Sequence, residues 1–250
     1  MTEENANNNE VEQPSINFLL DSKYPLMKEF REKCPGTFKH SQSLMSMIEG
    51  VSLALDLDED KMKIAALYHD VGKMFSPKYF SENQLENENP HDGIKPAMSH
   101  QLLTRHVSDS VAILINNPDF PREIIEIISQ HHGTTVLRYF CDKDKKGKDD
   151  DYRYKTTKPT SIESMVLMVC DAIEAMSKAL AQAGKFDPNK VINETLQRLI
   201  DDGQLDEVTM KLGDLKKIKA ALALELEGVY QKRVDYDEAA EEEKEEDNDS

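Results

Sequence analysis

One stretch, Leu67-Tyr68-His69-Asp70-Val71-Gly72-Lys73, sets an imidazole next to a carboxylate at the end of an apolar helical run. Successive helical residues point about 100° apart, because a helix turns once in about 3.6 residues, so His69 and Asp70 do not share one surface stripe. The two side chains can, however, flank a metal ion. Taken alone, the pair also fits a structural role, with Asp70 capping a helix beside a half-buried His69. Only the other residues of the chain can distinguish this role from metal binding.

Other metal-capable side chains stand in similar helical settings. His40 opens the preceding helical segment, His106 lies between Arg105 and Val107, and His131-His132 follows a strongly apolar helix. Asp171 directly follows the apolar run Met165-Val166-Leu167-Met168-Val169-Cys170. Burying an ionised carboxylate in such a helix costs several kcal/mol unless the group is paired or binds a metal. Asp171 therefore needs a cation.

These five imidazoles and two carboxylates form a mixed nitrogen and oxygen ligand set. Such a set suits first-row transition metals such as Fe, Mn, Zn or Ni, whereas Ca and Mg prefer oxygen ligands only. Seven ligands are too many for one centre. They fit a site with two metals about 3.5–4 Å apart that share a bridging carboxylate, which is a known arrangement for phosphoester hydrolysis.

The order of these residues resembles the HD-domain superfamily of metal-dependent phosphohydrolases, in the version that holds two metals. From about Leu19 to Tyr236 the chain resembles more narrowly the cytoplasmic HD domain of seven-transmembrane HD proteins, which hydrolyse cyclic di-AMP. The strings that carry this resemblance are Cys34-Pro35-Gly36-Thr37-Phe38-Lys39-His40-Ser41, Tyr68-His69-Asp70-Val71-Gly72-Lys73, Tyr79-Phe80-Ser81-Glu82-Asn83-Gln84, Asn89-Pro90-His91-Asp92, Gln130-His131-His132-Gly133-Thr134-Thr135 and Asp202-Gly203-Gln204-Leu205-Asp206-Glu207.

The resemblance implies an all-α, HD-domain helical bundle with a binuclear metal site. Asp70 would bridge the two metals, and Fe or Mn are the expected ions. A metal-bridging hydroxide would attack phosphorus and convert cyclic di-AMP to the linear dinucleotide pApA. The implied metal ligands are His40, His69, Asp70 and Asp171 for one ion, and Asp70, His106, His131 and His132 for the other.

Further residues are expected to act on the substrate. Asp70 and Lys73 are the predicted catalytic residues, with Lys73 neutralising phosphate charge, although it could be an ordinary surface lysine at a helix end. His91 and Arg138 are the predicted substrate-binding residues. His91 lies in a loop, and loops beside a rigid site often carry recognition. Arg138, on the helix expected over 136–141, is expected to lie over the cleft. A plain hydrogen-bonding role in the loop is the alternative for His91.

Two other functions compete with cyclic di-AMP hydrolysis. An HD phosphohydrolase could act on a different cyclic dinucleotide or on a nucleoside phosphate. A non-catalytic sensor could bind a nucleotide and signal through the acidic tail. Catalytically idle relatives usually lose ligands, and all seven are present here.

Composition sets limits on location and partners. The chain has 250 residues and 38% hydrophobic residues, but no stretch near the roughly 20 consecutive apolar residues of a membrane span. Its acidic, Asn-rich start does not look like a signal peptide. We expect a cytoplasmic protein without a membrane segment. Since the similar HD domains normally follow a membrane region, the chain is either a free-standing relative or part of a longer protein.

The net charge of −17 argues against a nucleic-acid polymer as partner, because such polymers are held by clustered Lys and Arg. A small-molecule nucleotide is still compatible, since bound metals supply positive charge locally. The three cysteines are odd in number and form no CxxC, which predicts reduced thiols. The sequence does not determine the oligomeric state.

The chain is expected to form one domain between two disordered ends. Residues 1–13 are rich in Asn and Glu and 238–250 are acidic, so both predict disorder, and 14–237 is the predicted HD domain. Capping residues and apolar spacing predict its helices. They are expected over 25–34, ended by Pro35-Gly36; 38–55; 59–69; 97–116 as two pieces; 121–130; 136–141; 161–180; 188–201; and 212–234, with 142–158 as a charged surface loop.

Overall fold

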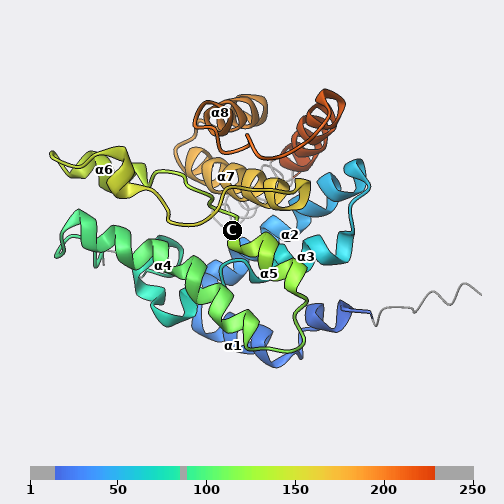
Figure 1. Cartoon of the computed structure of the whole chain (residues 1–250), viewed down its shortest axis with the longest axis horizontal. Coiled ribbons are helices and arrows are strands. Elements are labelled where there is room, and N and C mark those ends of the chain that lie inside the picture. The colour runs from blue at the N-terminus through green and yellow to red at the C-terminus, as the bar shows by residue number, and fades with distance from the viewer. Residues whose placement is uncertain (1–14, 85–88, 229–250) are drawn as a thin grey trace, which may run out of the picture.

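The computed structural model describes residues 15–84 and 89–228 of the chain (Figure 1). A further helix, over 212–228, follows the labelled ones. The α-helices are α1 (Pro25–Lys33), α2 (Pro35–Leu55), α3 (Glu59–Tyr68), α4 (Pro96–Ile115), α5 (Arg122–Ser129), α6 (Arg138–Lys143), α7 (Ile162–Gln182) and α8 (Pro188–Asp201). The 3-10 helices are η1 (Asn17–Leu20), η2 (Val71–Phe75), η3 (Pro77–Tyr79), η4 (Ser81–Asn83) and η5 (Asp149–Tyr152).

The fold is all-α, as the sequence predicts. Across the described ranges no β-strand forms, and extended pairing is limited to one isolated bridge between Val136 and Arg153. None of the helices described is both long enough and apolar enough to span a bilayer. The predicted disordered ends, 1–13 and 238–250, lie outside the described residues.

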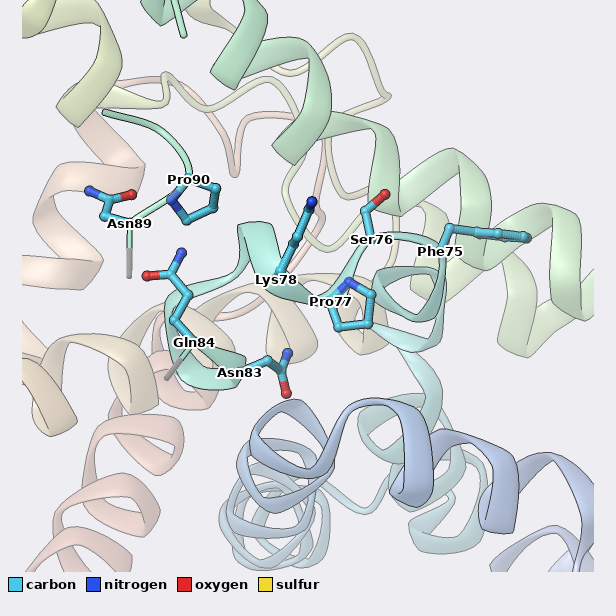
Figure 2. Close-up of a pocket in the computed structure, with 8 residues that line it drawn as sticks. All are labelled: Phe75, Ser76, Pro77, Lys78, Asn83, Gln84, Asn89 and Pro90. Atoms are coloured by element: carbon cyan, nitrogen blue, oxygen red, sulfur yellow. The ribbon is translucent and has the colours of Figure 1, made fainter. Parts of the chain in front are cut away.

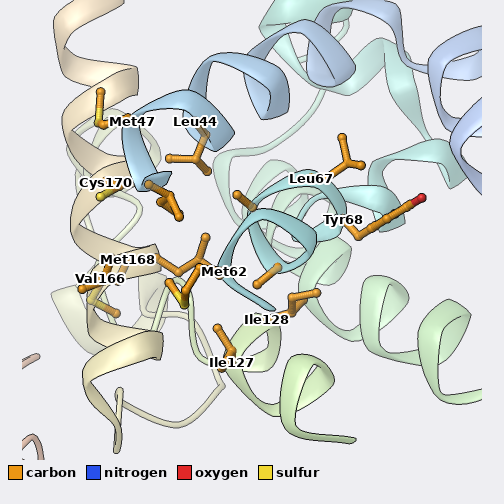
Figure 3. Close-up of a cluster of buried hydrophobic side chains, with 14 of the residues drawn as sticks. Leu44, Met47, Met62, Leu67, Tyr68, Ile127, Ile128, Val166, Met168 and Cys170 are labelled. Atoms are coloured by element: carbon orange, nitrogen blue, oxygen red, sulfur yellow. The ribbon is translucent and has the colours of Figure 1, made fainter. Parts of the chain in front are cut away.

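One hydrophobic core joins α2, α3, α5 and α7 (Figure 3). Leu44 from α2, Met62 from α3, Ile128 from α5 and Met168 from α7 all lie in this core, each with 2% exposure or less. Burying such side chains stabilises the fold by about 1.5–3 kcal/mol each relative to leaving them in water. Apolar packing therefore fixes the relative positions of α2, α3, α5 and α7.

Side-chain caps start three of the helices where the sequence predicts them. The carboxylate of Asp58 accepts a hydrogen bond from the backbone N–H of Lys61 at 2.9 Å, and α3 follows. Ser161 accepts from the N–H of Ser164 at the start of α7, and Asp187 plays the same part for α8. Each cap satisfies a backbone donor that the helix itself leaves unpaired.

Pro35 and Gly36 were expected to end a helix, and instead they start α2. Cys34 alone separates α1 from α2, and Pro35 is the first helical residue, a position that needs no N–H donor. Gly36 is required by close packing, because a β-carbon there would collide with the backbone carbonyl of Glu82. Pro35-Gly36 therefore does mark an interruption between two helices, but the interruption is the single residue Cys34.

The prediction of two helical pieces over 97–116 is wrong, since α4 is continuous. The hydroxyl of Thr104 donates back to the carbonyl of His100 at 2.9 Å, and Arg105 pairs with Asp109 one turn later at 3.1 Å. Both contacts run along the helix, so the polar residues at the expected joint do not interrupt it. The continuous helix places His106 near its middle.

The segment after α5 also differs from its prediction. Val136 lies in the bridge with Arg153 rather than in a helix, and α6 begins only at Arg138. The charged segment 142–158 is not simply a solvated loop, because Tyr152 and Tyr154 are buried at 1% and 7% exposure. Tyr152 ends η5 and Tyr154 follows the bridge residue Arg153, and both rings are held inside the fold on either side of Arg153. Surrounding Lys and Asp residues mask this burial in the sequence.

Candidate metal centre

Five elements converge on one polar cluster inside the bundle. His40 comes from α2, His106 from α4 and Asp171 from α7, while the pair His69-Asp70 joins α3 to η2 and the pair His131-His132 follows α5. The contacts of α2 with α7, α3 with α5 and α4 with η2 bring these side chains together. All seven side chains predicted as ligands therefore meet in space.

The seven side chains form two groups, each with its ligand-capable atoms within 4.8 Å of one another. One group is Asp70, His106, His131 and His132; the other is His40, His69 and Asp171. Four of the five imidazoles have side chains no more than 10% exposed, whereas that of His132 is 25% exposed. The cluster is thus largely closed to solvent.

Asp70 faces both groups. Its Oδ2 atom lies 3.1 Å from Nε2 of His69, and its Oδ1 atom lies 3.1 Å from Nε2 of His106 and 3.8 Å from Nε2 of His131. Asp171 belongs to the group of His40 and His69, and its Oδ1 atom lies 3.0 Å from Nε2 of His40. The position of Asp70 between the groups is the one that a bridging carboxylate requires.

Backbone carbonyls fix the tautomer of three imidazoles. Nδ1 of His69 lies 2.8 Å from the carbonyl of Ala66, and His106 and His131 make the same contact at 2.6 Å with the carbonyls of Leu103 and Ile128. Because a carbonyl only accepts, each Nδ1 carries a proton and each Nε2 faces the cluster, where the neutral form of the ring presents a lone pair.

A carboxylate orients the fourth imidazole. Nδ1 of His40 lies 2.6 Å from Oε2 of Glu174, while Nε2 points to Asp171. A carboxylate behind a histidine is a common way to hold the ring of a metal ligand. The sequence analysis missed Glu174, although its spacing from Asp171 on α7 puts the two on one helix face.

The unpaired atoms of the cluster fit a bound cation. Nε2 of His69 and Oδ1 of Asp70 are buried and make no hydrogen bond within the described residues. Nε2 of His106 and Nε2 of His131 lie 3.3 Å apart, so two lone pairs face each other. Leaving buried polar atoms unpaired is costly, and a metal ion would satisfy all of them. The residues present therefore fit divalent metals.

Charge is distributed unevenly over the cluster. Burial raises the pKa of Asp70, but the charges on His69 and Lys73 outweigh it and hold the pKa well below its usual value. Burial likewise lowers the pKa of His40, yet hydrogen bonds to Asp171 and Glu174 raise it to about 9.

In the imidazole-rich group, the pKa values of two histidines are lowered, in contrast to that of His40. Burial, together with the charge on His69, lowers the pKa of His131 to about 3. Burial and the neighbouring His131 also hold the pKa of His132 well below its usual value. Both rings are therefore neutral at physiological pH, which is the form that binds a metal.

Lys73 extends the cluster on the side of η2. Its Nζ atom lies 2.7 Å from Oδ2 of Asp70 and 2.8 Å from Oε1 of Glu82, and it sits over the ring of Phe80. Gly72 allows η2 to pack against α4, because a β-carbon there would collide with the carbonyl of His106. Lys73 is therefore a largely buried neighbour of the cluster and not an ordinary surface lysine.

The two predicted substrate residues lie elsewhere. Nε2 of His91 contacts the carbonyl of Tyr79 at 2.7 Å, and its ring packs on Phe140. Arg138 makes two hydrogen bonds to Asp149, at 2.8 and 2.9 Å, and its side chain is 55% exposed. Neither residue contacts the seven clustered side chains.

A pocket of about 750 Å³ opens beside η2 and η4 (Figure 2). Phe75, Lys78, Asn83 and Asn89 are among the residues that line it. None of its lining residues belongs to the cluster. The pocket therefore adds no group to the chemistry of the metal centre.

Sequence comparisons identify relatives of the chain. The HD domain family matches residues 37–176. Two curated relatives are named cyclic-di-AMP phosphodiesterase PgpH: the Listeria monocytogenes protein is 33% identical over 222 residues, and the Bacillus subtilis protein is 31% identical over 225 residues. These alignments cover 87% and 88% of this chain but 31% and 32% of the relatives, so the chain spans less than a third of their length.

Solved structures have the same fold. Two crystal structures of the L. monocytogenes phosphodiesterase PgpH HD domain match with a TM-score of 0.76 and with 33% and 32% sequence identity. The matches cover 83% of this chain and 99% and 97% of those chains, and the second structure is a complex with cyclic di-AMP. An HD domain implies dependence on divalent metal, and the His and Asp groups described above could hold such ions. This chain belongs to the HD domain family.

Proposed function

We propose that the chain is a metal-dependent phosphodiesterase that hydrolyses cyclic di-AMP to pApA. The observation that carries the proposal is the convergence of seven His and Asp side chains into two groups around Asp70. Support for the substrate comes from the 32% identity to the PgpH HD domain in complex with cyclic di-AMP. The hydrolase reaction itself is supported by the names of the two curated relatives.

The proposed ligand assignment follows the two groups. His40, His69 and Asp171 would hold one ion, and His106, His131 and His132 the other, with Asp70 shared between them. Bound divalent metals supply Lewis acidity toward a phosphoryl oxygen and increase the acidity of water. We propose Fe or Mn, since both accept mixed imidazole and carboxylate ligands.

The residues of the chain orient and balance this site. The Nδ1 contacts of His40, His69, His106 and His131 hold the rings with Nε2 facing inward. Lys73 holds Oδ2 of Asp70, and its positive charge lies where it can offset negative charge on a phosphoryl group. Asp70 and Lys73 are thus the proposed catalytic residues.

Roles for His91 and Arg138 in substrate binding stay predictions. Their hydrogen bonds go to Tyr79 and Asp149, so a substrate would have to reach them beyond the cluster. The cytoplasmic location and the absence of a nucleic-acid polymer as partner also stay predictions.

Hydrolysis assays with the metal-loaded protein test the proposal. We expect turnover of cyclic di-AMP in preference to cyclic di-GMP and mononucleotides, with pApA as the product. Asp70→Ala should lose this activity, whereas Asp142→Asn, whose side chain is 66% exposed, should keep it. Preference for another nucleotide would reject the substrate. A metal-loaded wild type that binds cyclic di-AMP without cleaving it would identify a sensor instead of an enzyme.

A further inference from the structure

His132 differs from the other four clustered imidazoles in how its ring is held. Each of the others has an Nδ1 contact to a carbonyl or a carboxylate. Neither ring nitrogen of His132 makes a hydrogen bond within the part of the chain that the structure describes, and its Nδ1 approaches Oδ2 of Asp171 only to 4.0 Å. Its side chain is also the most exposed of the five, at 25%. Another contact must therefore restrict the orientation of this ring.

Tyr154 makes that contact. The ring centroids of Tyr154 and His132 lie 4.4 Å apart with an angle of 31° between the ring planes. Tyr154 also forms a T-shaped pair with His106, with ring centroids 6.2 Å apart. His131 packs on His132 as well, with centroids 4.1 Å apart. Because flat rings in contact resist rotation, this packing can fix the imidazole without a hydrogen bond.

The backbone that carries His132 also holds Tyr154 in place. The N–H of Tyr154 donates to the carbonyl of Thr135 at 3.0 Å, and the N–H of Leu137 donates to the carbonyl of Tyr152 at 2.9 Å. These bonds flank the antiparallel bridge between Val136 and Arg153. The two rings are therefore connected through a short paired segment, which keeps their spacing constant.

Polar contacts from the turn after α8 hold the same segment. The Arg153 guanidinium donates to the carbonyl of Thr134 at 2.7 Å and to both carboxylate oxygens of Asp202, at 2.8 and 3.1 Å. The side chain of Gln204 is fully buried, and its Oε1 accepts from the N–H of Thr134 at 2.9 Å. The turn that follows His132 is thus braced from two sides.

We propose that Tyr154 is a positioning residue for His132. Its ring takes the place of the Nδ1 contact that orients the other four imidazoles, and it thereby sets the metal affinity of the group Asp70, His106, His131 and His132. This inference rests on the proposed function, because it assumes that the group binds a divalent cation. The ring, and not the hydroxyl, is the part of Tyr154 that acts.

Metal titration of the full chain tests this role. The metal-stripped protein is titrated with Mn²⁺ by calorimetry, and one binding event is expected for each of the two groups. The event that His132→Ala weakens is the one that belongs to the group containing His132. Tyr154→Met keeps an apolar side chain but removes the flat ring, and we expect it to weaken that event about 10- to 100-fold while the other event is unchanged. Tyr154→Phe keeps the ring and should bind Mn²⁺ like the wild type.

Two comparisons separate positioning from general loss of packing. Tyr152→Met is the matched control, because Tyr152 is buried in the same segment but packs on His100, which belongs to neither group. It should leave both events unchanged. In a His132→Ala background, Tyr154→Met should have no further effect on Mn²⁺ affinity, since residues that act through one another are not additive.

The inference is overturned if Tyr154→Met binds both Mn²⁺ ions like the wild type, if Tyr152→Met weakens binding equally, or if the effect of Tyr154→Met persists without His132. A loss in Tyr154→Phe would assign the effect to the hydroxyl and would also overturn it. A wild-type chain that binds neither Mn²⁺ nor Fe²⁺ would reject the proposed function itself, which is a different result.

Discussion

Nζ of Lys73 lies 2.7 Å from Oδ2 of Asp70, and the two form an ion pair whose side chains are only 13% and 3% exposed. This pair occupies one oxygen of Asp70 and leaves Oδ1, which makes no hydrogen bond within the described residues, facing His106 and His131. A second carboxylate, Glu82, contacts the same Nζ at 2.8 Å. Lys73 therefore balances two buried negative charges before any metal binds.

Lys73→Met tests this charge balance. Removing one partner of a buried ion pair leaves an uncompensated charge, so we expect the metal-free variant to lose about 3–5 kcal/mol of unfolding free energy. Urea denaturation measures this loss, and added Mn²⁺ should recover part of it by offsetting Asp70. Lys63→Met removes a lysine whose partner Glu49 is 53% exposed, and it should cost about 1 kcal/mol or less. Equal losses in the two variants would contradict the expectation.

Metal removal is expected to destabilise the folded chain. The two groups bring unpaired nitrogen and oxygen atoms together in the folded state only, so a metal should bind that state in preference to the unfolded chain. Free Mn²⁺ at about 100 times its Kd would add about 2.7 kcal/mol per site. Thermal melting with a chelator and then with restored Mn²⁺ measures the effect. A melting temperature that does not respond to either treatment would argue against both sites.

Side-chain chemistry made much of the fold predictable. Asp58, Ser161 and Asp187 each start a helix, because a short polar side chain can accept from the first free N–H groups. The seven clustered residues were predictable for a related reason. Imidazoles and carboxylates within or next to apolar helices need a partner that the apolar core cannot supply, and their order resembles a known family.

The supporting residues were not predictable from the sequence. Glu174 and Tyr154 reach the cluster through contacts between segments far apart in the chain, such as Glu174 with His40, whereas Glu82 reaches it through Lys73 across a series of short 3-10 helices. Tyr154 in particular stands among lysines and aspartates that suggest exposure. Its burial results from pairing with the segment after His132, which no local pattern reports.

Gly133→Ala is expected to destabilise the turn after His132. Gly133 has φ +50°, and a β-carbon there would lie 2.5 Å from Oε1 of Gln204 and 2.8 Å from Cε of Met168. The variant therefore combines backbone strain with a clash against a buried amide, and we expect a loss of about 2–4 kcal/mol. Gly184→Ala is the matched control, since Gly184 has φ +65° but no atom within 4 Å of the added carbon. It should cost about 1 kcal/mol from strain alone. Urea denaturation of both variants gives the difference, and similar losses would show that Gln204 does not crowd this position.

Asp202→Asn tests the ion pair that braces the same turn, and its effect depends on pH. Hydrogen bonds from Arg153 lower the pKa of Asp202 below its usual value, so the folded state favours the charged form. The stability that this gives is present above the unfolded pKa of about 4 and is lost as the pH falls through the lower folded pKa. Because the side chain of Asp202 is 28% exposed, we expect the substitution to cost only about 1 kcal/mol at neutral pH. The gap in unfolding free energy between wild type and variant should shrink below about pH 4. A gap of constant size across that range would mean that the carboxylate charge does not contribute to holding Arg153 at the turn.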